Sequence, residues 1–176
     1  MNTTKADGFA LIDLIFTVGL IATLAMLALP RLVLARQSAG AASAIGSMRT
    51  ISSAQLSFAL TCGGGFYAPN LTTLGTPPPA STSGFVSPQL AVANQVTRAG
   101  YLIQMAATPF APAPPSCNGL ALGATGQAFK AGADPVEPGN VRFFGINANG
   151  QIWEHTASLF AAMPEAGEPA IGHLLK

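Results

Sequence analysis

One long apolar run dominates the N-terminal part of the chain and covers residues 9–30. As a helix with a rise of about 1.5 Å per residue, a run of this length spans roughly 30 Å, which is the thickness of the hydrocarbon core of a bilayer. The apolar core of a secretory signal peptide is shorter, roughly 7 to 15 residues, and is followed by a small-x-small cleavage site. Because this run is longer and no clear cleavage site follows it, we predict a retained transmembrane helix.

The helical pattern continues beyond Pro30. Residues at steps of three and four form one stripe, typical of an amphipathic helix: Leu34, Ala41, Ala44 or Ile45, Met48, Ile51 or Ala54, Gln55 and Phe58. The predicted polar face contains Arg36, Ser38, Ser43, Ser47, Arg49 and Ser53. We therefore predict one helix from Phe9 to about Leu60, kinked at Pro30, where the proline ring displaces a backbone hydrogen bond. The three glycines within residues 61–67 should end it.

Turn-forming residues and strand signals fill the rest of the chain. Residues 68–99 are rich in Pro, Thr, Ser and Gly, and predict a long surface loop with a short helical turn near residues 87–92. Three later segments, starting at Gly100, Gly126 and Asn140, combine β-branched or aromatic residues with flanking Gly and Pro. This composition is typical of strands.

The last of these segments contains a hairpin signal, because Asn149-Gly150 separates two apolar runs. The tail from Ala157 onward shows no regular pattern. We predict an antiparallel sheet of three or four strands, with the amphipathic half of the helix covering one face. The expected fold class is α+β.

The composition is unusually poor in charge. Charged residues make up 9% of the chain and the formal net charge is +1, whereas a typical soluble protein has about 25% charged residues. No basic surface for nucleic acid is expected. Lys5 precedes the apolar run and Arg31 and Arg36 follow it, so the positive-inside comparison leaves the orientation open.

The two cysteines, Cys62 and Cys117, lie too far apart in sequence for a C-x-x-C metal or redox motif. A disulfide is expected if the domain lies outside the cytoplasm, and two unpaired thiols are the alternative.

The carboxylates Asp134 and Glu137 are a candidate calcium site, but they supply fewer ligands than the 6 to 8 oxygens that calcium normally takes. No metal site, cofactor or catalytic group is predicted.

Residues 8–30, GFALIDLIFTVGLIATLAMLALP, resemble the N-terminus of type IV pilins and type II secretion pseudopilins. The shared features are a polar leader ending in Gly, then Phe, an apolar segment with one acidic residue, and a kinking proline. Residues 49–75 and 141–153 are also similar to segments common in pilin-like proteins. The resemblance implies that a prepilin peptidase cuts between Gly8 and Phe9 and methylates the new Phe9 amine. Asp13 is the acidic residue, where the family usually has glutamate, and Pro30 is the kinking proline.

The resemblance also implies a pilin-like organisation and a structural role without enzymatic activity. Residues 1–8 would be the leader, 9–30 the transmembrane and assembly half of the helix, 31–60 its amphipathic half, and 61–176 a periplasmic globular domain. The implied product is a type IV pilus-like or secretion pseudopilus filament, assembled from the bacterial inner membrane. Implied partners are other copies of the chain, prepilin peptidase, an assembly ATPase and inner-membrane platform machinery.

A carboxylate within a membrane helix requires a physical reason, because a charge at the bilayer centre costs at least about 2.5 to 3.5 kcal/mol. Asp13 lies near one end of the run, and cleavage would create a positively charged amine at Phe9 close by. Pairing with the amine of a neighbouring subunit would fix the register between subunits; an aspartate that snorkels without a partner is the alternative. The alternative function is an uncleaved, single-pass, membrane-anchored periplasmic binding or adaptor protein. An anchored enzyme has no catalytic motif in its favour.

Overall fold

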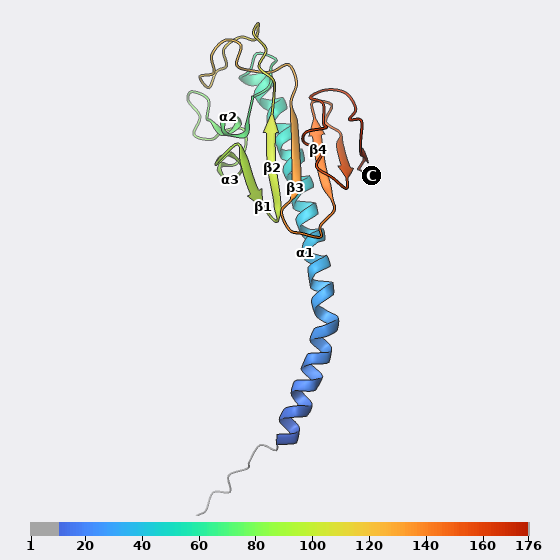
Figure 1. Ribbon diagram of the computed structural model, residues 1–176. Helices are drawn as coiled ribbons and strands as arrows, with labels where there is room; N and C mark the ends of the chain where they lie inside the picture. The colour runs from blue at the N-terminus through green and yellow to red at the C-terminus, as the bar shows by residue number, and fades with distance from the viewer. Residues whose placement is uncertain (1–10, 176) are drawn as a thin grey trace, which may run out of the picture. The chain divides into compact units, whose positions relative to one another are not determined.

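The computed structural model describes residues 11–175 (Figure 1). The chain forms two compact units, Met1–Ser38 and Ala39–Lys176. Helix α1, Leu11–Thr61, contributes residues to both units. The predicted junction between Gly8 and Phe9 lies outside the described residues. The long predicted helix is confirmed over the part of its length that the structure describes.

The described part of the first unit is entirely helical and includes Pro30 inside the helix. Because proline has no N–H, the carbonyl of Met26 one turn earlier loses its usual helical partner. The kink at Pro30 stays a prediction. Leu34, which the periodicity assigned to the buried stripe, is 59% exposed. That assignment was wrong because the buried stripe of α1 begins only at Gly40.

In the second unit, α1 buries one face against the sheet (Figure 1). The buried positions follow the predicted three- and four-residue steps: Gly40, Ala41, Ala44, Ser47, Met48, Ile51, Ala54, Gln55, Phe58 and Ala59. The placement of Ser47 on the polar face was wrong, since it is 5% exposed. Its hydroxyl donates to the Ser43 carbonyl at 2.9 Å, which satisfies the donor within the helix.

Helix α1 ends at the glycine run, as predicted. The backbone N–H groups of Cys62 and Gly63 both donate to the carbonyl of Phe58, at 2.8 and 2.7 Å. Gly64 and Gly65 follow with φ angles of 59° and 93°. This left-handed region favours glycine because a side chain there clashes with the backbone.

The second unit contains a six-stranded antiparallel sheet in which each strand pairs with the next along the chain. The strands are β1 Gln95–Arg98, β2 Tyr101–Ala106, β3 Lys130–Pro135, β4 Phe143–Asn147, β5 Ile152–His155 and β6 His173–Leu174. Two short helices, α2 Leu71–Gly75 and α3 Pro88–Ala91, precede β1. The second of these confirms the helical turn predicted near residues 87–92.

The prediction of three or four strands was wrong, because β1 and β6 were not recognised. β1 lies in the stretch predicted as a loop, and β6 lies in the tail predicted as irregular. Both are edge strands, short and largely exposed, so their side chains need not alternate between apolar and polar. The Asn149-Gly150 hairpin is confirmed: it joins β4 to β5, and Gly150 has a φ of 75°.

The inner face of the sheet and α1 together form the main core. The sheet contributes Tyr101, Ile103 and Met105 from β2, Ala131 and Ala133 from β3, and Phe144 and Ile146 from β4. These side chains alternate along each strand with residues that point to the other face, as the pleat requires. The expected α+β arrangement, a long N-terminal helix with a small antiparallel sheet, is confirmed.

The outer face of the sheet is covered by the chain's own C-terminal segment. Gly132 on β3 lies opposite Gly145 on β4, and a Cβ atom added at Gly145 would lie 3.1 Å from the Cβ of Leu159. Leu159 and Met163 are buried there and form a second apolar cluster with Trp153. The paired glycines thus make room for a segment that has no regular structure of its own.

Candidate functional site

The apolar part of α1 exposes its large side chains on every side. Between Leu11 and Leu34 their exposed fractions range from 49% at Leu32 to 78% at Met26. By length and composition this helix qualifies as a candidate membrane span, and none of its most apolar window is buried in the structure. A helix that is apolar all round needs a lipid or protein environment.

Polar groups within this segment are few, and its hydroxyls are satisfied internally. The Thr17 hydroxyl donates to the Leu14 carbonyl at 3.0 Å, and the Thr23 hydroxyl donates to the Leu20 carbonyl at 2.8 Å. Such bonds let threonine enter an apolar environment without an unpaired donor. Asp13 differs, because a carboxylate group can only accept hydrogen bonds.

Asp13 lies in the first described turn of α1 and is exposed. Among the described residues, no cation lies within ion-pairing distance of its carboxylate. The helix therefore presents one acidic group on an apolar surface. Its predicted partner, the amine of Phe9, lies outside the described residues.

Cys62 and Cys117 form a disulfide, which confirms the bonded alternative. Their Cα atoms lie 4.8 Å apart, and the Cys117 N–H donates to the Cys62 carbonyl at 3.0 Å. The bond ties the C-terminal end of α1 to the long loop between β2 and β3. Disulfides persist in oxidising compartments and are rare in the cytosol.

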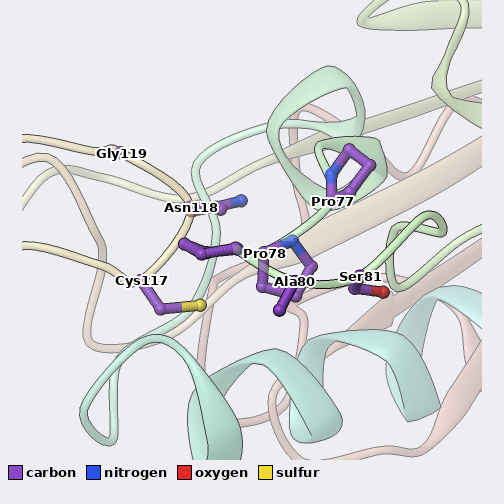
Figure 2. A pocket seen from close by; sticks show the side chains of 8 residues that line it. Pro77, Pro78, Ala80, Ser81, Cys117, Asn118 and Gly119 are labelled. Carbon is purple, nitrogen blue, oxygen red and sulfur yellow. The ribbon is translucent and has the colours of Figure 1, made fainter.

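A shallow groove of about 560 Å³ lies beside the disulfide (Figure 2). Its lining residues come from two loops: Pro77, Pro78, Pro79, Ala80 and Ser81 from one, and Cys117, Asn118 and Gly119 from the other. The side-chain amide of Asn118 donates to the carbonyls of Thr73 and Thr76, at 3.0 and 3.3 Å, and so ties its loop to the C-terminal end of α2, just before residues 77–81. The groove is otherwise mainly apolar.

Gln55 is a structurally important residue whose role the sequence did not indicate. It is fully buried, and its amide pairs with the backbone of Ala68 in both directions. The Ala68 N–H donates to Gln55 Oε1 at 2.9 Å, and Gln55 Nε2 donates to the Ala68 carbonyl at 2.8 Å. The Gln55 side chain thereby pairs with the backbone of Ala68 in the way that a neighbouring strand would.

Two carboxylates of the second unit, Glu154 and Asp134, are hydrogen-bonded to nearby side chains. Arg142 donates to both carboxylate oxygens of Glu154, at 2.6 and 3.0 Å, and these hydrogen bonds lower the pKa of Glu154. Burial raises the pKa of Asp134, partly offset by a hydrogen bond from Ser158 at 2.6 Å. Among residues 11–175, no cluster of three or more His, Cys, Asp or Glu side chains could hold a metal ion.

The structure places Asp13 and Pro30 on one helix and joins Cys62 to Cys117. Gly8 and Phe9, at which cleavage is predicted, are outside the described range. Comparison of the chain with protein-family models, with curated proteins and with solved structures found no match.

Proposed function

We propose that this chain is a non-enzymatic structural subunit of a type IV pilus-like or type II secretion pseudopilus filament. Prepilin peptidase would cleave it between Gly8 and Phe9 and methylate Phe9. The observation that carries this proposal is the apolar helix, exposed on all sides, with a single carboxylate near its start. From Gly40 onward one face of the same helix is buried in a small α+β unit, as expected for a subunit with a polymerising helix and a separate globular domain.

Before assembly, the chain would reside in the bacterial inner membrane with its globular domain in the periplasm. The candidate membrane span supports the anchoring, and the disulfide supports an oxidising compartment for the domain. Extraction into the filament would require an assembly ATPase and inner-membrane platform machinery. These partners follow from the resemblance of residues 8–30.

Asp13 would select the register between subunits. When apolar helices leave the lipid and pack together, a carboxylate without a partner is strongly disfavoured, and removing one partner of a buried ion pair costs about 3 to 5 kcal/mol. An axial offset that brings Asp13 to the Phe9 amine of a neighbour avoids this cost. Repetition of such a head-to-tail contact, which does not close on itself, gives an open helical fibre.

Substitution of Asp13 tests this role. Asp13→Ala should insert in the membrane and be cleaved normally but yield few filaments, whereas Asp13→Glu keeps the charge and should assemble. Thr23→Ala is a matched control. It removes a polar group from the same segment, and the hydroxyl of Thr23 hydrogen-bonds only to the Leu20 carbonyl of its own helix. Membrane fractionation, N-terminal mass analysis and electron microscopy separate the steps. Normal filament yield from Asp13→Ala would refute the register role.

A further inference from the structure

The two cysteines of the disulfide differ in their exposure to solvent. Cys62 is 7% exposed and belongs to the main apolar core. Cys117 is exposed and lines the groove formed with residues 77–81 (Figure 2). Cys62 is not among the groove-lining residues. A molecule that enters the groove therefore meets Cys117 first.

We infer that Cys117 is the sulfur through which this disulfide exchanges with an external thiol or disulfide, and that Cys62 is the internal partner. The external molecule would carry a reactive sulfur and fit a shallow apolar groove. A small thiol such as glutathione and the dithiol site of an oxidoreductase share this chemistry. The inference does not depend on the proposed filament function.

In the reductive direction, an external thiolate attacks Sγ of Cys117. The bond between the two cysteine sulfurs breaks, and its electron pair leaves on Sγ of Cys62, which takes up a proton. In the oxidative direction, the external partner's disulfide supplies the oxidising equivalents and first forms a mixed disulfide at Cys117. The Cys62 thiolate then attacks the Cys117 sulfur and expels the partner's thiolate, which closes the bond.

Leaving-group chemistry alone would favour the opposite site. A thiolate at Cys62 is disfavoured by burial and by its position at the C-terminal end of α1, so Cys117 would be the better leaving group. Attack on Cys62, however, requires the external thiolate to reach a buried sulfur, which happens only when the surrounding structure opens. Access therefore decides the site of attack, and Cys117 is the cysteine that is exposed and lines the groove.

The native protein provides the first test. The oxidised full-length chain in detergent is treated with reduced glutathione, quenched with acid, and mapped by peptide mass analysis without further reduction. Glutathione is expected on Cys117 in at least about tenfold excess over Cys62, since attack at the buried site requires local opening. Equal labelling of both sites, or predominant labelling of Cys62, would overturn the inference.

Two single variants provide the second test. In Cys62→Ser the remaining Cys117 thiol should react with oxidised glutathione at least about tenfold faster than the Cys62 thiol that remains in Cys117→Ser. In denaturing urea the two rates should become similar, which shows that the difference arises from the fold. If either variant fails to fold, the mapping of the native protein still decides. A rate ratio near one in folded variants would contradict the inference.

Discussion

Replacement of Gln55 by leucine should destabilise the second unit severely, although the two side chains have similar volumes. Gln55 and Ala68 are both fully buried. The glutamine amide is the partner of the Ala68 N–H and carbonyl in the structure, at 2.9 and 2.8 Å. Leucine fills a similar space but offers no donor or acceptor, so the substitution isolates the hydrogen-bonding contribution from the loss of packing.

The expected magnitude follows from the two backbone groups that lose their partner. Each buried polar group left unsatisfied costs about 1 to 3 kcal/mol, so Gln55→Leu should lower the free energy of unfolding by about 2 to 6 kcal/mol. Total stabilities are about 5 to 15 kcal/mol for typical proteins. The loss is thus a large share of the whole.

Urea denaturation of the full-length chain in detergent measures this loss. Trp153, the only tryptophan, is 8% exposed in the outer apolar cluster and reports unfolding by fluorescence. Gln151→Leu is the matched control, because Gln151 is exposed in the hairpin turn and should change stability by no more than about 0.5 kcal/mol. A Gln55→Leu variant as stable as this control would show that the hydrogen bonds between Gln55 and Ala68 do not stabilise the fold.

Two further predictions concern the second unit. Removal of the disulfide in a Cys62→Ser and Cys117→Ser double variant should cost up to about 4 kcal/mol, from the loop entropy of a 55-residue separation, and an unchanged urea midpoint would contradict this. The lowered pKa of Glu154 stabilises the fold above its unfolded value of about 4.3, and this contribution is lost as pH falls through the folded pKa. Because Arg142 and Glu154 are 45% and 17% exposed, the loss should stay below about 1 kcal/mol, and Glu154→Gln should abolish it in acid titrations of stability.

The sequence predicted the features that depend on local pattern. Neighbouring residues determine three of these features: the three- and four-residue spacing of the buried positions in α1, the end of α1 at the glycine run, and the Asn149-Gly150 hairpin. The long-range disulfide was predictable only as one of two alternatives, because cysteine spacing does not show which loops meet. Its confirmation required the fold that brings residues 62 and 117 together.

The features that were missed depend on partners distant in the chain or on weak local signals. Gln55 lay in the predicted stripe, but no pattern shows that it bonds to a backbone segment 13 residues later. Leu159 and Met163 cover the outer face of the sheet, where Gly132 and Gly145 have no side chains and leave space for their segment. No local pattern in the sequence shows that these distant residues meet. β1 consists of Gln95, Val96, Thr97 and Arg98, a mostly polar edge strand without an apolar face.

In the predicted site, the positions of Asp13 and Pro30 follow from local sequence, whereas the partner of Asp13 does not. Asp13 and Pro30 were assigned from their positions in residues 8–30, and the structure places both on a helix with an exposed apolar surface. The partner of Asp13 depends on a cleavage event and on a second subunit. Neither of these is set by the fold of a single chain.

The intact mass of the mature protein, purified from membranes of a host that has prepilin peptidase, shows whether the chain is processed as proposed. The expected product is a chain that begins at Phe9 and carries one methyl group on its amine. A peptidase-deficient host is the control, in which the same gene should yield the uncleaved chain. A mature protein that retains Met1, or one that begins at an unmodified Phe9, would overturn the proposed filament function, and the uncleaved form would favour a membrane-anchored adaptor.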